Sequence, residues 1–169
     1  MKYTSSEANK LLKKLNEEKR ILLDNEARSS VFNAALGEDV ESVRPAYSYS
    51  ETVGKLSELN SKIRKLKHLI NVFNATTIVD GFDMTIDEML IYIPQLTEDK
   101  NRLYGLSARL PKERRSVGGY GSNTVIDYTY ANYDVAKAEA DYLAVCDLLA
   151  RAQTALDVTN NSIIMEFDL

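Results

Sequence analysis

One stretch of the chain carries apolar side chains at alternating intervals of three and four residues. Within residues 50–74 these positions are held by Leu56, Leu59, Ile63, Leu66, Ile70 and Phe73. The spacing is the a/d pattern of a heptad repeat, which places all of these side chains on one stripe of an α-helix. Because such a stripe has to be buried against another helix, the chain is predicted to fold by packing long helices side by side.

A second stretch, 133–160, keeps the same spacing. Its seam positions are held by Val135, Ala138, Tyr142, Val145, Leu149, Ala152 and Leu156. The charges beside the first seam are mainly basic over 51–67, and those beside the second are mainly acidic over 131–157. Opposite charges that flank two seams help to set which helices pair. The charge balance therefore favours packing of the helix at 50–74 against the helix at 133–160.

Two further helices are predicted from their start signals. The sequence T-x-x-E occurs at 4–7 and again at 85–88. This is the capping box, in which two side chains satisfy free amides of a helix N-terminus. It predicts helices over about 5–32 and 86–110. Pro94 should kink the second of these or delay its start to about residue 93.

Few residues in the chain break helices, so these helices can be long. There are three prolines and seven glycines among 169 residues. The stretches 33–49 and 111–130 lack helical periodicity, and the second contains β-branched and aromatic residues. We predict an all-α fold, an elongated antiparallel helical bundle of coiled-coil hairpins with a short β-prone arm near 120–130. The prediction is one helical domain over 1–169, with helices at about 5–32, 50–74, 86–110 and 133–160.

The ends of the two heptad helices resemble one another. Residues 70–74 read INVFN and are followed, after one alanine, by TTIV, whereas 156–160 read LDVTN and are followed, after one asparagine, by SIIM. Two helical hairpins of one plan would explain this resemblance, and chance is the competing explanation. The apolar tail after residue 161 is β-prone and is predicted to dock as an extended segment.

The charge balance argues against several classes of partner. The net charge is −4, which makes nucleic acid and anionic lipid poor partners for the chain as a whole. No run of about eighteen apolar residues is present, so we expect no membrane-spanning helix. The first twenty residues lack the apolar core of a secretory signal. A cytoplasmic location is the expectation.

One local cluster departs from this acidic balance. Its members are Arg109, Lys112, Arg114 and Arg115, followed by Tyr120, Tyr128, Tyr130 and Tyr133. Basic residues with interleaved aromatic residues can bind single-stranded nucleic acid. Because Glu113 interrupts the short basic run and the chain is acidic, we expect no nucleic-acid partner. The tyrosines are assigned instead to an interface or to the core.

No motif predicts catalysis, a cofactor or a metal ion. The single histidine, His68, falls on the outer f position of 50–74, so neither a bundle metal site nor a histidine-activated nucleophile is supported. The single cysteine, Cys146, lies beside the second seam next to an acid, where nothing activates it. The glycines at 118–121 lack the strand, the Lys-Ser/Thr pair and the helix of a phosphate loop. We predict no catalytic residue, no cofactor and no enzyme.

The stretch LINVFNATTIVDGFDMTIDEML at 69–90 resembles a signature of the septicolysin-like family of small bacterial helical proteins. The turn positions that carry the resemblance are Asn71, Asn74, Thr76, Asp80, Gly81 and Thr85. The resemblance implies a helix, an Asp-Gly turn and a threonine-capped helix in that order. The family name implies a haemolysin-type activity on membranes, but it implies a role for no individual residue.

These patterns lead to one hypothesis about function and two rivals. The first is a non-enzymatic helical interaction protein that associates with copies of itself through its heptad seams. The alternative is a septicolysin-like, membrane-active protein, which would be the one case with a membrane partner. An enzyme built inside the bundle or between subunits is the third hypothesis, and no motif supports it.

Overall fold

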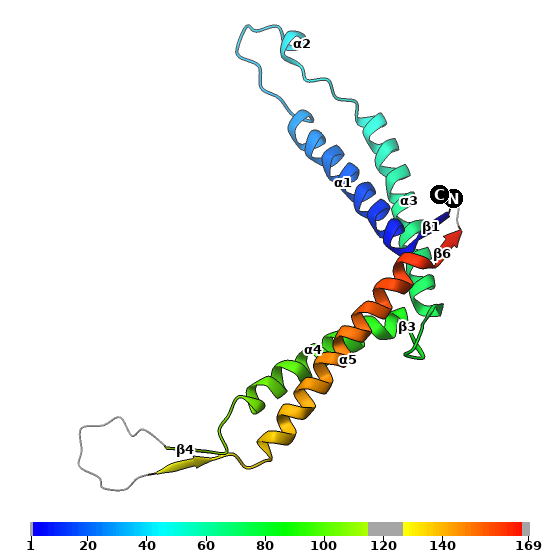
Figure 1. Ribbon diagram of the computed structural model, residues 1–169. Coiled ribbons are helices and arrows are strands. Elements are labelled where there is room, and N and C mark those ends of the chain that lie inside the picture. The colour runs from blue at the N-terminus through cyan, green and yellow to red at the C-terminus, as the bar shows by residue number, and fades with distance from the viewer. Residues whose placement is uncertain (1, 115–126, 167–169) are drawn as a thin grey trace, which may run out of the picture. The chain divides into compact units, whose positions relative to one another are not determined.

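A computed structural model describes residues 2–114 and 127–166 of the chain (Figure 1). Most of these residues are helical and the strands are short, so the prediction of a mainly helical protein is confirmed. In chain order the elements are β1 (Lys2–Thr4), α1 (Ser5–Ser29), α2 (Val40–Val43), α3 (Tyr49–Thr76), β2 (Ile78–Val79), β3 (Met84–Thr85), α4 (Ile86–Ser107), β4 (Lys112–Arg114), β5 (Tyr128–Tyr130), α5 (Val135–Ser162) and β6 (Ile164–Glu166).

The four long helices occupy the segments in which the sequence predicts them, and both predicted capping boxes are formed. The backbone N–H of Thr4 donates to the Glu7 carboxylate at 2.8 Å, and the Thr4 hydroxyl accepts from the Glu7 N–H at 3.2 Å. At the start of α4, Thr85 and Glu88 make the same two bonds at 2.7 and 3.2 Å. The short side chains at 4 and 85 therefore fix where α1 and α4 begin.

Pro94 lies inside α4, so the expectation that it delays the helix start to about residue 93 is wrong. The capping box at Thr85 starts the helix at Ile86 despite the proline that follows. Pro94 has no N–H, and the carbonyl of Leu90 therefore lacks its helical donor. Leu90 and Pro94 are both exposed, so this stretch of α4 faces solvent, where water can replace the missing bond.

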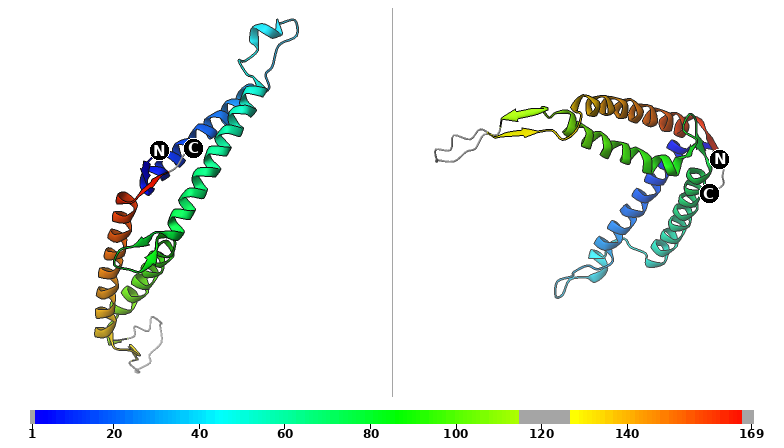
Figure 2. Two further views of the ribbon diagram at one scale, coloured as in Figure 1. Left: turned by 90° about the vertical axis from the view of Figure 1, so that its right-hand side faces the viewer. Right: turned by 90° about the horizontal axis from the view of Figure 1, so that it is seen from below.

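The chain divides into two compact units, Met1–Thr77 with Val158–Leu169, and Ile78–Asp157. In the first unit α1 and α3 run side by side in opposite directions (Figures 1 and 2). The packing partner of α3 in this unit is therefore α1, whereas the charge balance favoured the helix at 133–160. The strands β1 and β6 pair antiparallel there, with Tyr3 opposite Met165, so the β-prone tail docks as predicted. The core of this unit is formed by Ala8, Leu15, Ile63, Leu66, Ile70 and Met165.

In the second unit α4 lies beside the part of α5 that precedes residue 158 (Figure 2). The Tyr104 and Tyr142 rings meet at 5.7 Å between centroids. The strand pairs β2–β3 and β4–β5 belong to this unit. Of the predicted β-prone arm near 120–130, residues 128–130 form β5, and 115–126 lie outside the described residues. Buried apolar residues of this unit are Val79, Ile86, Met89, Leu96, Leu103, Ala138, Leu149, Ala152 and Leu156.

The two halves of the chain repeat one order of elements. The first half reads β1, α1, α3, β2, and the second half reads β3, α4, α5, β6, with α2 as an addition in the first connection and β4 and β5 as additions in the second. The first strand of each half pairs with the last strand of the other half, because β1 pairs with β6 and β3 pairs with β2. The pairing is equivalent as well, because Thr4 lies opposite Ile164 and Thr85 lies opposite Ile78.

The helix ends that suggested an internal repeat also match in detail. The Thr76 hydroxyl donates to the carbonyl of Val72 at 2.8 Å, and the Ser162 hydroxyl donates to that of Val158 at 2.7 Å. Each helix is followed within two residues by a strand. Equivalent hydrogen bonds, order and strand register support two hairpins of one plan over a chance resemblance.

Candidate interaction site

Every residue of the two predicted seams lies on the less exposed side of its helix. In α3 the buried members are Ile63, Leu66 and Ile70, and the half-buried members are Leu56, Leu59 and Phe73. In α5 the buried members are Ala138, Leu149, Ala152 and Leu156, and the half-buried members are Val135, Tyr142 and Val145. In both helices, the half-buried seam residues gather mainly at the N-terminal end, next to the connection from the preceding long helix. Two helices alone leave such a seam open on one side.

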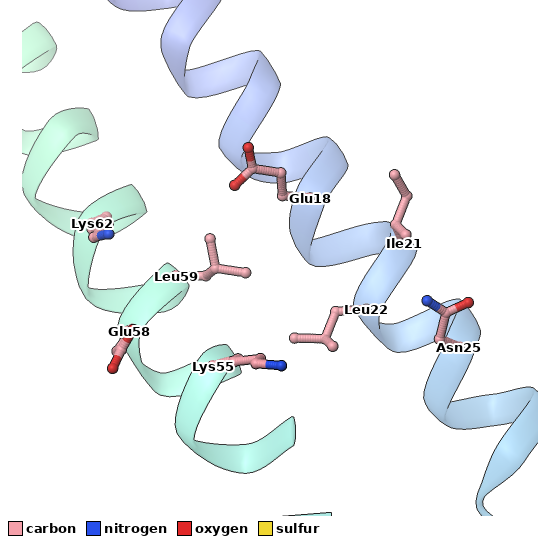
Figure 3. Close-up of a pocket in the computed structure, with 8 residues that line it drawn as sticks. All are labelled: Glu18, Ile21, Leu22, Asn25, Lys55, Glu58, Leu59 and Lys62. Atoms are coloured by element: carbon pink, nitrogen blue, oxygen red, sulfur yellow. The ribbon is translucent and has the colours of Figure 1, made fainter. Parts of the chain in front are cut away.

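A cleft of about 390 Å³ opens between α1 and α3 in the half-buried part of the first seam (Figure 3). Leu22 of α1 and Leu59 of α3 point toward one another across it. The residues that line the cleft are Glu18, Ile21, Leu22, Asn25, Lys55, Glu58, Leu59 and Lys62. It is therefore an apolar floor between two charged rims.

The sequence of α1 explains why the cleft stays open. Glu18 and Asn25 stand about one turn before and one turn after Leu22, where a closed seam would hold apolar side chains. Burying a carboxylate or an amide without partners is costly, so both side chains stay in solvent. Leu22 is left as the apolar contact of α1 in this part of the hairpin, and it is only half-buried.

The rims carry charges of opposite sign. The rim on α3 presents Lys55 and Lys62 with Glu58 between them, and the rim on α1 presents Glu18. Glu18 has a long contact with Lys14 of its own helix, 3.9 Å between Nζ and Oε1. Among the residues that the structure describes, no ion pair joins the two rims, so these charges are available to another molecule.

A second, smaller cleft of about 180 Å³ continues toward the connection between α1 and α3 and shares Leu22, Asn25 and Lys55 with the first. At its edge the Tyr47 hydroxyl donates to the Glu26 carboxylate at 2.7 Å. This bond favours the protonated phenol, and together with the nearby negative charge it raises the pKa of Tyr47. Sequence reasoning missed this contact, because it links residues 21 positions apart in an irregular segment.

The turn residues of the septicolysin-like resemblance fall at the end of α3 and in the β2–β3 hairpin. Asn71 is exposed, and the side-chain oxygen of Asn74 is buried without a hydrogen-bond partner among the described residues. Gly81 has φ +79°, a conformation that glycine adopts without steric cost. Asp80 and Gly81 line a shallow cleft of about 410 Å³ together with Phe82, Ala150, Arg151, Thr154 and Ala155.

The groups considered for chemistry do not converge. His68 is exposed on α3, as its f position predicts. Cys146 is half-buried on α5, and its hydrogen bond with the Tyr142 hydroxyl raises the pKa of Tyr142. Within 2–114 and 127–166, no group of histidine, cysteine and acidic side chains is placed to hold a metal ion.

The basic and aromatic cluster is brought together in part. Lys112, Arg114, Tyr128 and Tyr130 lie on the β4–β5 ribbon, and Arg109 and Tyr133 flank it. Arg115 and Tyr120 lie outside the described residues. None of the helices in the described parts of the chain is long and apolar enough to cross a membrane.

Comparisons with known proteins identify the architecture and leave the activity open. No protein-family model matches the chain, and no curated protein sequence matches it significantly. A solved structure of a functionally unknown conserved protein from Corynebacterium diphtheriae is similar, with a TM-score of 0.61 and 15% identity. The match covers 98% of this chain and 100% of that chain. At this identity the likeness shows a shared, mainly helical fold and nothing about function.

Proposed function

We propose that this protein is a non-enzymatic helical interaction protein that associates with copies of itself, so that seams left open in one chain are completed as a helical bundle of coiled-coil type. The observation that carries the proposal is the cleft between α1 and α3, where Leu22 and Leu59 face one another and stay only half-buried within the first unit. A cytoplasmic location is part of the same proposal.

The charges on the rims favour a second copy as the partner. A two-fold contact brings the same patch of both molecules together, so the patch has to be complementary to itself. Glu18 on one rim and Lys55 and Lys62 on the other meet this condition, because each rim of one copy can face the opposite rim of its partner. Pairs of exposed charges set orientation and contribute little to affinity.

The apolar part of the patch is small, so the association is expected to be weak. Ile21 is 46% exposed beside Leu22 and Leu59. Covering each half-exposed side chain contributes about 1 kcal/mol, and two copies supply six of them. Part of this gain is offset by the loss of translational and rotational freedom. Self-association is therefore expected at roughly micromolar concentrations and above.

Sedimentation velocity over about 1 to 100 micromolar protein tests the proposal. The sedimentation coefficient of the natural chain is expected to rise with concentration, and Ile21→Glu is expected to remove that rise. Leu23→Glu is the matched control, because Leu23 is 42% exposed on the same helix and does not line the cleft. Thermal melts show that both variants fold. A natural chain that stays monomeric throughout, or two variants that behave alike, would contradict the proposal.

A second proposal, membrane activity of the septicolysin-like type, is supported by the resemblance at 69–90 alone. Such an activity would have to start from binding at the membrane surface, since no described helix can cross a bilayer. Dye leakage from liposomes of zwitterionic and of anionic lipid is the measurement. Absence of leakage at high protein concentration removes this proposal and leaves the first one standing.

A further inference from the structure

The register of the β4–β5 ribbon sorts its side chains by chemistry. The opposed pairs are Lys112–Tyr130, Glu113–Thr129 and Arg114–Tyr128. Side chains alternate between the two faces along a strand, and directly opposed residues share a face. The first and third pairs therefore project from one face, and the middle pair projects from the other. We call the face that carries Lys112, Arg114, Tyr128 and Tyr130 the basic–aromatic face.

This register removes the objection that Glu113 interrupts the basic run. Glu113 lies directly opposite Thr129, and this pair projects from the side of the ribbon opposite to the basic–aromatic face. A shift of the pairing by one residue would have mixed the acid with the tyrosines. As paired, the basic–aromatic face carries two cations and two aromatic rings, and the described strands place no acid on it.

The two rings are exposed and lie next to one another. Tyr128 is 44% exposed and Tyr130 is 62% exposed, and their centroids are 6.4 Å apart with the planes tilted by 52°. The Lys112 ammonium lies 4.1 Å from the Tyr128 centroid and 5.4 Å from the Tyr130 centroid. Cation–π contacts at exposed sites are weak, so this flexible side chain can move away and leave the rings free.

The base of the ribbon is held in place by α4. The Tyr133 hydroxyl donates to the carbonyl of Leu106 at 2.8 Å, and the backbone N–H of Ala131 donates to that of Pro111 at 3.1 Å. These bonds fix both strands where they leave the helical hairpin. Because the ribbon is held at its base, less of it has to be ordered when a ligand binds, which lowers the entropic cost of binding.

We propose that the basic–aromatic face binds single-stranded nucleic acid. Neighbouring aromatic rings on the face of a sheet stack unpaired bases, and the adjacent Lys112 and Arg114 are placed to hold phosphates. In a duplex the bases are already stacked on one another, so a single strand is the form that offers them to Tyr128 and Tyr130. The net charge of −4 does not oppose this locally, because charges farther than about 8–10 Å away are screened at physiological salt.

The test is fluorescence anisotropy of labelled oligo-dT and oligo-U with the full-length protein. With two phosphates held, log K is expected to fall with log salt at a slope of about −1.4, a roughly sevenfold loss between 50 and 200 mM. Tyr130→Ala is expected to weaken binding roughly fivefold or more, because a stacked base is lost. Tyr130→Phe keeps the ring and is expected to keep the affinity, whereas Lys112→Glu lowers the affinity and flattens the salt slope.

Glu113→Gln and Thr129→Ala are the matched controls, since both residues lie on the opposite face of the same strands. These controls are expected to bind as the natural chain does, and an unlabelled duplex is expected to compete poorly. Absence of oligonucleotide binding at 50 mM salt overturns the proposal, as does an equal loss in the control variants. Binding to anionic vesicles through Lys112 and Tyr130, without oligonucleotide binding, overturns it in favour of a membrane partner.

Discussion

The two helical hairpins, α1 with α3 and α4 with α5, each begin with a short strand and a capping box, and they differ at the connections between their helices. In the first hairpin the connection spans 30–48, contains the four-residue α2, and lies next to an open cleft. In the second hairpin the connection spans 108–134 and contains the strands β4 and β5. Helices built to one plan thus present an apolar cleft at one connection and a basic–aromatic face at the other. Binding functions commonly gather at connections that a rigid scaffold holds.

The difference between open and closed seams traces to a few positions. Aligning the halves on their caps and helix ends places Leu106 where the first half has Asn25, and Leu148 where it has Lys62. Leu106 and Leu148 are half-buried, and Leu103, the counterpart of Leu22, is buried. The less complete burial of Leu22 therefore goes together with polar side chains at two seam-edge positions of the first hairpin.

The largest effect is expected from Leu66→Ala in the core of the first unit. Leu66 is fully buried, and removing its side chain leaves a cavity among Ala8, Ile63 and Ile70. The expected loss is about 2–5 kcal/mol in the free energy of unfolding. Urea denaturation followed by circular dichroism measures it. A loss below about 1 kcal/mol would show that the two helices repack or that the first seam does not stabilise the hairpin.

The counterpart of Leu66 in the second half is Ala152, which is also fully buried. Because this seam position of α5 already holds a small side chain, the informative substitution here enlarges the side chain. Ala152→Leu is expected to cost about 1–3 kcal/mol through overpacking, measured by the same urea denaturation. The exposed Ala150 on the same helix provides the matched control, and Ala150→Leu should change the free energy of unfolding little. Equal losses in the two variants would show that the seam of α5 is not tightly packed at Ala152.

Much of the fold was predictable because it depends on local signals. Each of these signals lies within one or two helix turns and can be recognised without knowledge of the rest of the fold. They are the capping boxes at Thr4 and Thr85 and the alternating spacing from Leu56 to Phe73, and the structure has helices at all three places. The β-prone tail was predicted as an extended segment, but its partner β1 was not, because a pairing between segments so distant in sequence leaves no local trace. The cap at Thr85 placed the start of α4 correctly at Ile86, and the later start considered because of Pro94 does not occur.

The candidate sites were less predictable than the helices. Seam positions indicate that Leu22 and Leu59 face a partner helix, but whether another chain segment covers them is a property of the whole fold. The basic–aromatic cluster was recognised in the sequence and then set aside because of Glu113. Only the strand register, which pairs Lys112 with Tyr130 and Arg114 with Tyr128, assigns Glu113 to the opposite face.

The two capping boxes allow a smaller and more local comparison. Thr85→Ala is expected to cost about 1 kcal/mol, because the amide of Glu88 loses its acceptor. Thr4→Ala removes the same bond from α1, so its cost should be of the same size. Thermal denaturation of the two variants measures both losses. A clearly smaller loss for Thr4→Ala would show that the β1–β6 pair, and not the cap, holds the start of α1.

The capping box of α4 also predicts a dependence on pH. The backbone N–H and the hydroxyl of Thr85 bond to the Glu88 carboxylate and hold the pKa of Glu88 below its usual value. A carboxyl whose pKa is lowered by folding stabilises the folded state above its unfolded pKa, and it loses this contribution as pH falls through the folded value. Glu88→Gln should remove this component of the acid sensitivity while still accepting the Thr85 N–H. Thermal melts between about pH 3 and 7 compare the two proteins, and an unchanged profile would contradict the assignment.

The smallest expected effect concerns the charged rims of the cleft between α1 and α3. Glu18→Lys and Lys62→Glu each place like charges opposite one another in a two-fold contact, and each should weaken self-association a few-fold. Combining the two restores opposite signs with the rims exchanged, so the double variant should associate about as well as the natural chain. Neither single change should alter the melting temperature much, because both side chains are exposed.

Raising the salt concentration should shrink all of these differences in self-association together, since exposed ion pairs are screened. If the double variant associates no better than the single ones, the rims do not face one another, and the apolar floor of Leu22 and Leu59 must be covered in another geometry.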